Sequence, residues 1–249
     1  MAEALGPRAR HRPWPAPGAP WVMTQTWLDL LFAHWPVPVE ALRPRVPPAL
    51  PIDTFGGEAW IGVVPFRMSG ARPRLVPPLP WLSAFPELNV RTYVTLDNKP
   101  GVYFFSLDAG NPAAVAAARV WAHLRYFSAD MAVQPDGDSV HYASRRTHAG
   151  APPAELIASY RSTGPAAPAP TGSLADWLTS RYCLYAADRG GRIYRLEIDH
   201  VPWPLQPAGA TFQVNTMAEA AGVRLPDRPP LLHFSRRLDM RAWWPRRVS

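Results

Sequence analysis

The chain has almost no lysine, because arginine supplies all but one of its 26 basic side chains and Lys99 is the exception. Schiff-base catalysis needs a lysine amine, so only Lys99 could supply it. It lies in residues 96–101, Leu-Asp-Asn-Lys-Pro-Gly, which are typical of a turn. In an exposed turn the amine keeps a pKa of about 10.4 and is mostly protonated at neutral pH. We therefore expect Lys99 to be a solvent-facing turn residue.

Cysteine and long apolar runs are also scarce. Cys183 is the sole cysteine, which excludes an internal disulfide and a thiolate metal cluster, and we expect a small buried side chain. No apolar run approaches the ~20 residues of a membrane span. The N-terminal arginines, Arg8, Arg10 and Arg12, are followed by proline rather than by the apolar segment of a signal peptide. These absences predict a cytoplasmic protein that does not bind membranes.

Several motifs of catalysis and nucleotide binding are missing. Neither GxxxxGK[ST] nor GxGxxG occurs, and the GxSxG of a hydrolase is absent. The seven histidines include no i, i+4 pair and no HExxH sequence. We therefore expect no metal and no cofactor.

The net charge of +7 resides at the two ends of the chain. Residues 1–20 carry +2 and residues 236–249 carry +4, which leaves +1 for the body of the protein. Basic ends can bind polyanions, so contact with nucleic acid or an acidic partner is one alternative function. The excess of arginine over lysine is also typical of a GC-rich genome, and nucleic-acid binding is the less favoured interpretation.

What the chain does contain favours a single β-rich domain. It has 249 residues, of which 47% are hydrophobic and 11% aromatic, and its 32 prolines disfavour long helices. Residues 1–20 show no apolar period and are predicted to be a disordered leader, and Met23 could be a second start. We assign residues 21–249 to one domain.

Local patterns place the elements of this domain. Alternation over residues 88–96, followed by a turn and by residues 102–107, predicts a β-hairpin. Asn111-Pro112 predicts the start of a helix through residue 120, Ser173 begins a second helix through Tyr182, and Asn215 or Thr216 caps a short third one. Residues 69–86 and 164–170 are predicted loops. Further strands are expected over residues 59–66, 122–127, 139–143, 156–162 and 192–198.

Glu87, Asn89 and Arg91 lie at i, i+2 and i+4 of the first hairpin strand and therefore project from one face. If this face points into a closed barrel, the three side chains line a pocket for a carboxylate or carbonyl ligand, with Arg91 as the anion clamp. If it points outward, they are ordinary solvated residues. The sequence alone leaves both alternatives open.

Four segments resemble the acetoacetate decarboxylase-like superfamily: residues 39–50, 60–68, 85–94 and the hairpin over 96–111. Two more, residues 181–185 and 200–207, resemble its uncharacterised, bacterial YqjF-like branch. The resemblance covers roughly residues 21–248. It implies a mainly β (α+β) fold, a strongly curved antiparallel β-barrel or cone with a few peripheral helices and an internal ligand cavity.

The resemblance also implies where a Schiff-base lysine would stand, after the proline that follows the hairpin. Here Pro112 is followed by Ala113 and Ala114, and the position near Trp60 that would match an acidic partner is aromatic. We therefore expect no Schiff-base decarboxylation.

Two functions remain alongside the polyanion alternative. The first is a small-molecule pocket with Glu87, Asn89 and Arg91 as polar residues. The second is a non-Schiff-base enzyme acting on a keto or enol substrate, with Arg91 as electrophile and Glu87 or His123 as proton carrier. The sequence identifies neither the ligand nor the oligomeric state, monomer or homo-oligomer. Candidate apolar lining residues are Trp60, Tyr93, Tyr103 and Phe105.

Overall fold

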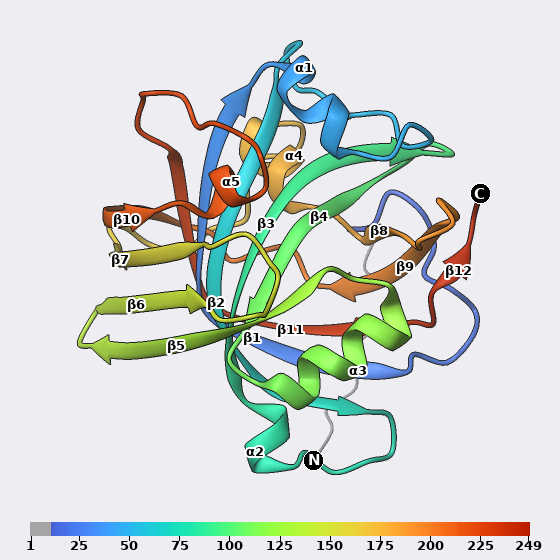
Figure 1. The fold of residues 1–249 in the computed structure, drawn as a ribbon, viewed down its shortest axis with the longest axis horizontal. Helices are drawn as coiled ribbons and strands as arrows, with labels where there is room; N and C mark the ends of the chain where they lie inside the picture. The colour runs from blue at the N-terminus through green and yellow to red at the C-terminus, as the bar shows by residue number, and fades with distance from the viewer. Residues whose placement is uncertain (1–10) are drawn as a thin grey trace.

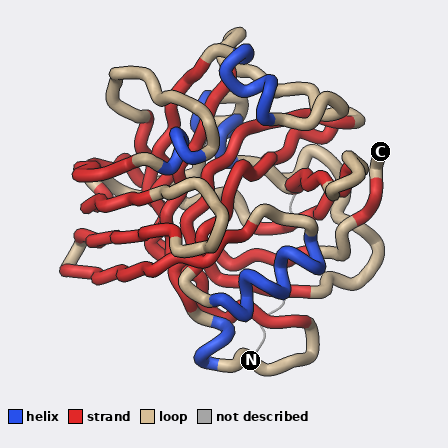
Figure 2. Tube along the Cα trace, viewed as in Figure 1, coloured by secondary structure: helices blue, strands red, loops and turns tan. Residues whose placement is uncertain are grey.

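The computed structural model describes residues 11–249, except for the side chains of residues 80, 81, 117, 118 and 120–122. Strands dominate this part of the chain, and short helices lie at the edges (Figures 1 and 2). The strands are β1 Met23–Val37, β2 Ala59–Pro73, β3 Phe85–Leu96, β4 Lys99–Ala109, β5 Tyr126–Asp136, β6 Ser139–Arg146, β7 Glu155–Ser162, β8 Cys183–Ala187, β9 Ile193–His200, β10 Gln206–Asn215, β11 Leu231–Ala242 and β12 Arg246–Arg247. The helices are α1 Val39–Leu42, the 3-10 turn Arg43–Arg45, α2 Pro80–Ser83, α3 Pro112–Ala122, α4 Leu174–Thr179 and α5 Met217–Ala220.

The sheet closes on itself twice. Nine strands form a larger ring: β1 to β7, β10 and β11. Seven strands form a smaller ring: β1 to β4, β8, β9 and β11. The sheet divides at β4, which pairs in parallel with both β5 and β8, and at β11, which pairs with both β10 and β9. The other pairings are antiparallel, which confirms the expected mainly antiparallel, curved barrel.

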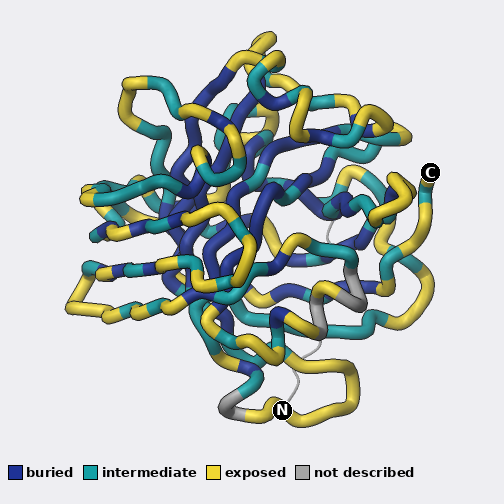
Figure 3. Tube along the Cα trace, viewed as in Figure 1, coloured by how far each residue is buried: buried dark blue, intermediate teal, exposed yellow. Residues whose placement is uncertain are grey.

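Five strands, β11, β1, β2, β3 and β4, belong to both rings and form a shared wall between them. Because side chains alternate along a strand, one face of this wall enters the larger ring and the other face enters the smaller ring. The larger ring is filled by the main hydrophobic core, to which Leu31, Ile61, Val90 and Tyr103 contribute. Most buried residues of the wall lie in the middle of its strands, whereas many exposed residues lie in loops and hairpin ends (Figure 3).

Local sequence explains how the central elements begin and end. Asp97 and Asn98 have φ of 53° and 57°, the left-handed pair that a tight two-residue hairpin turn requires. Asn111 accepts hydrogen bonds from the amides of Ala113 and Ala114, and Pro112 occupies the first turn of α3. Both the predicted hairpin and the predicted helix are therefore confirmed.

Several predicted boundaries were wrong. β2 continues to Pro73 and α2 interrupts what was expected to be one loop over residues 69–86. The strand expected over residues 122–127 begins only at Tyr126, because α3 extends to Ala122. α4 ends at Thr179 rather than at Tyr182. Residues 236–242, counted with the basic end, lie within β11. Pairing with β1, which is distant in sequence, accounts for the extension of β2 to Pro73 and for the course of β11 through residues 236–242.

The expected disordered leader is also wrong for residues 11–20, the part of it that the structure describes. Glu197 of β9 accepts hydrogen bonds from Arg12 Nη2 at 2.8 Å and from Trp14 Nε1 at 2.7 Å. Trp243 donates to the Ala19 carbonyl at 2.7 Å. This segment therefore packs against β9 and against the residue that follows β11. Residues 1–10 lie outside the described part of the chain.

Lys99 contacts the same acidic residue. Its ammonium lies 3.2 Å from Glu197 Oε1 and 5.4 Å from the centre of the Trp14 ring, and only 28% of its side chain is exposed. The expectation of a solvent-facing turn residue is therefore wrong, because the N-terminal segment covers this end of the hairpin.

None of the helices in the described part of the chain has the length and apolar character that crossing a membrane requires.

Candidate ligand cavity

A cavity of about 540 Å³ lies inside the smaller ring. Its wall consists mostly of apolar side chains, among them Trp27, Phe66, Phe104 and Met240. Some lining residues are solvent-exposed and mark the opening: Arg72, Pro73, Ala113 and Trp244. Others are buried and mark the interior: Thr179, Arg181, Cys183 and His200.

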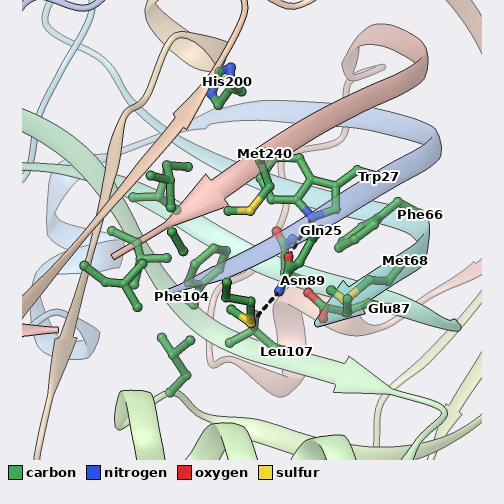
Figure 4. A pocket seen from close by; sticks show the side chains of 18 of the residues that line it. Gln25, Trp27, Phe66, Met68, Glu87, Asn89, Phe104, Leu107, His200 and Met240 are labelled. Atoms are coloured by element: carbon green, nitrogen blue, oxygen red, sulfur yellow. Dashed lines mark hydrogen bonds between the residues drawn. The ribbon is translucent and has the colours of Figure 1, made fainter. Parts of the chain in front are cut away.

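β3 carries a row of polar side chains along this cavity. Glu87, Asn89 and Arg91 all line it, so the face that they share points into the smaller ring. In Figure 4, Glu87 and Asn89 project from the strand on the side of the pocket where Phe66 and Met68 lie, and His200 lies well away from them. Asn89 is buried, and its Oδ1 has no hydrogen-bond partner within the described residues. The amide oxygen thus keeps an unused acceptor position beside the cavity.

Burial favours the neutral form of the Glu87 carboxyl. Burial raises the pKa of its carboxyl to about 8, and this effect outweighs the hydrogen bond that Tyr126 Oη donates to Oε2 at 2.9 Å. Nearby Asp108 raises the pKa further. A protonated carboxyl can donate a hydrogen bond or a proton inside the cavity, which an ionised one cannot.

Two guanidinium groups lie near the Tyr93 ring at the inner end of the cavity. Arg91 Cζ is 5.7 Å and Arg181 Cζ 4.9 Å from the centre of the Tyr93 ring. Arg181 donates to Asp53 Oδ2 at 2.6 Å, whereas Arg91 makes no ion pair within residues 11–249. Buried Arg91 Nε and Arg181 Nη2 both lack a hydrogen-bond partner there.

The uncharged neighbours leave this end of the cavity positive. Burial raises the pKa of Tyr93, so its hydroxyl stays neutral. Burial lowers the pKa of His34, whose Nε2 lies 2.6 Å from Tyr93 Oη, so the imidazole is also neutral. The guanidiniums of Arg91 and Arg181 and the carboxylate of Asp53 together carry a net charge of +1. An anion can therefore be stabilised there.

Other predicted site residues lie elsewhere. Tyr103 and Phe105 face the larger ring and pack in its core, so the expectation that they line the pocket is wrong. Trp60 and Tyr93 belong to a separate cluster with Val102 and Leu178, and they do not line the cavity either. Tyr93 contributes through its contacts with the two arginines.

His123 is not a lining residue. It ends α3 in a left-handed conformation, with φ of 53°, and its ring lies 4.6 Å from that of Tyr194. It is therefore misplaced for the proton-carrier role that we considered for it. Conversely, sequence reasoning missed Arg181, although it begins one of the segments that carry the YqjF-like resemblance.

The two alanines that stand where the resemblance would place a Schiff-base lysine border the cavity. Ala113 and Ala114 line it near the opening, whereas Lys99 is not among the lining residues.

Cys183, as expected, is buried, and burial raises its pKa to about 12. Within the described residues, no group of three His, Cys, Asp or Glu side chains is placed to hold a metal ion.

Comparison with known proteins supplies the family. Residues 24–239 match DUF2071, described as an uncharacterized conserved protein. The chain belongs to the DUF2071 family. This DUF2071 protein is 47% identical over 227 residues to the uncharacterized protein YqjF of Bacillus subtilis, and the match covers 91% of this chain and 93% of that one. The expected YqjF-like membership is confirmed.

Solved structures with the same fold belong to the acetoacetate decarboxylase-like group. The acetoacetate decarboxylase of Legionella pneumophila aligns with a TM-score of 0.61 at 12% identity, covering 95% of this chain and 93% of its own. The enduracididine biosynthesis enzyme MppR, complexed with pyruvate, also aligns with a TM-score of 0.61 at 12% identity, covering 93% of this chain and 91% of its own. At these identities the similarity establishes the fold of this DUF2071 protein.

Proposed function

We propose that this protein binds a small carboxylate- or carbonyl-bearing molecule in the smaller ring, with Arg91 as the anion-binding residue and without a Schiff base. The observation that carries the proposal is Arg91 itself, a guanidinium on a mostly apolar cavity with no carboxylate partner within the described residues. Leaving a cation partly desolvated is costly, and a bound anion would offset that cost.

Two further observations support the proposal. MppR, which shares the fold, binds pyruvate, a small keto acid. Lys99 forms an ion pair with Glu197 and is not a lining residue, while the lining positions Ala113 and Ala114 offer no amine. A ligand held by Arg91 would thus bind without a covalent bond to a lysine amine. Binding of a polyanion through the basic ends stays a prediction.

Replacing Arg91 by methionine tests the proposal. We expect calorimetry to show carboxylate binding, tested with pyruvate, acetoacetate and butyrate, that weakens at least tenfold in Arg91→Met because a charge-assisted hydrogen bond is lost. Arg145→Met is the matched control, since this arginine is 70% exposed and pairs only with the exposed Asp130. Borohydride added with pyruvate should leave Lys99 unlabelled. Binding that is equal in wild type and Arg91→Met would refute the assignment.

A second candidate function is an enzyme acting on a keto or enol substrate, favoured by the raised pKa of Glu87. In this reading the neutral carboxyl donates its proton to the carbon of an enolate and regains one from water, so that the ketone forms and the acid is restored. Four residues of strand separate Glu87 from Arg91, roughly 13 Å of backbone. The carboxylate and the reacting ketone must therefore lie several carbons apart.

Hydrogen exchange tests this second function. With 6-oxooctanoate in D₂O, we expect the wild-type protein to accelerate deuterium incorporation beside the ketone, as followed by NMR. Glu87→Gln should abolish the acceleration while calorimetric binding persists, because the amide keeps the shape but can neither take the proton from the carbon beside the ketone nor return one. Equal exchange rates in buffer and in wild-type protein would exclude this activity.

A further inference from the structure

We infer that the ligand is an amphipathic carboxylate, with its head at Arg91 and Arg181 and an aliphatic tail of about eight to twelve carbons along the smaller ring. This inference rests on the proposed function and specifies the class of ligand. It combines three features of the cavity: the charge at its inner end, the apolar wall between the ends, and the position of the opening.

The inner end is suited to a carboxylate head. Arg181 is buried, and although it donates to Asp53 and to the Trp177 carbonyl, its Nη2 remains without a partner within the described residues. Arg91 stacks on Phe32, with Cζ 5.1 Å from the ring centre, which fixes the guanidinium while leaving Nε without a partner. Two such donors beside one cavity can hold the two oxygens of a carboxylate.

The wall between the ends is suited to an aliphatic chain. Phe66, Met68, Phe104, Leu107 and Met240 line it. A cavity of about 540 Å³ has the size of pockets that hold drug-sized ligands, whereas pyruvate has only six non-hydrogen atoms. A short keto acid bound at Arg91 would leave most of this apolar surface without contacts. A longer chain would fill it.

Strand register directs the tail toward the opening. Along β3, lining residues run from Arg91 through Glu87 to Phe85, and β1 lines the cavity from Leu30 to Met23. Met23 pairs with Pro73 on one side and Ala242 on the other, so exposed Pro73 and Trp244 flank the same strand end. A tail that leaves the arginines therefore passes along apolar side chains until it reaches this rim.

A chain-length series tests the inference. We expect calorimetric Kd values for butyrate, hexanoate, octanoate and decanoate to fall about fourfold for each added methylene, the gain typical of burying a CH₂ group. Octan-1-ol, which has the tail without the charge, should bind more weakly than octanoate. Arg91→Met should remove that difference, and Arg145→Met should preserve it.

A variant near the opening tests the direction of the tail independently. Ala71 lines the cavity close to Arg72 and is only partly buried, so the larger side chain of Ala71→Trp would occupy the path of the tail near the rim. We expect this variant to weaken decanoate at least tenfold and to leave butyrate unchanged. Equal weakening of both ligands would contradict the predicted orientation.

The outcomes separate this inference from the proposed function. If butyrate and decanoate bind equally well and both depend on Arg91, the inferred aliphatic tail is refuted and the proposed anion-binding site at Arg91 is retained. If octan-1-ol binds as tightly as octanoate in wild type, the carboxylate head is wrong. If none of these carboxylates binds, nor pyruvate or acetoacetate, the proposed function itself is refuted.

Discussion

Between pH 5 and pH 8, we expect the free energy of unfolding of the wild-type protein to fall by roughly 3.5 kcal/mol relative to that of Glu87→Gln, since a pKa shift is worth about 1.36 kcal/mol per unit. The reason is the buried carboxyl. Its pKa is raised from 4.5 to about 8 in the folded protein, so the folded state keeps a proton that the unfolded state releases. Raising the pH therefore draws the equilibrium toward unfolding, and the loss is complete once the pH has passed the folded value.

Urea unfolding of both proteins at pH 5, 6, 7 and 8 measures this difference. The glutamine amide is neutral throughout, so the variant lacks the pH-dependent contribution of residue 87 and retains those of the histidines and other groups. Glu40→Gln is the control, because Glu40 lies exposed in the first turn of α1 and should follow the wild-type curve. Parallel curves for wild type and Glu87→Gln would show that the carboxyl is ionised, and would remove the proton donor from the second candidate function.

Replacing Arg146 by methionine should cost about 3–5 kcal/mol of stability, the range for leaving one member of a buried ion pair alone. Arg146 Nε and Nη2 contact the two Asp108 oxygens at 2.6 and 2.8 Å, and the two side chains are 3% and 0% exposed. Asp108 lies where β5 pairs with β4, so the ion pair joins the end of β6 to the point where the sheet divides.

The adjacent position provides the control. Arg145 and Asp130 also form an ion pair, but both side chains are about 70% exposed, so Asp130→Asn should cost at most ~1 kcal/mol. The double variant Asp108→Leu/Arg146→Met should recover much of the stability lost in Arg146→Met, because no buried charge is left alone. Urea denaturation measures all three. A loss in Arg146→Met no larger than that in Asp130→Asn would contradict the role of the buried pair.

Some properties follow from the sequence because they depend on neighbouring residues. Alternation along β3 places Glu87, Asn89 and Arg91 on one face, whether that face lies against a core, a cavity or solvent. Asp97-Asn98 specify the hairpin turn, and Asn111-Pro112 specify the start of α3. The segments that resemble the acetoacetate decarboxylase-like superfamily also predicted the curved barrel. The family match and the shared fold confirm this prediction.

Only the tertiary structure decided which face of the shared wall meets a core and which meets a cavity. Tyr103 and Phe105 alternate with Phe104 as any strand residues would, yet the first two enter the filled larger ring and Phe104 lines the cavity. That choice depends on β4 and β11 pairing with strands far away in the chain. The same long-range closure brings Arg181 to Arg91 and the N-terminal segment to Glu197. Local residue patterns contain no record of such contacts, because they form only when both rings close.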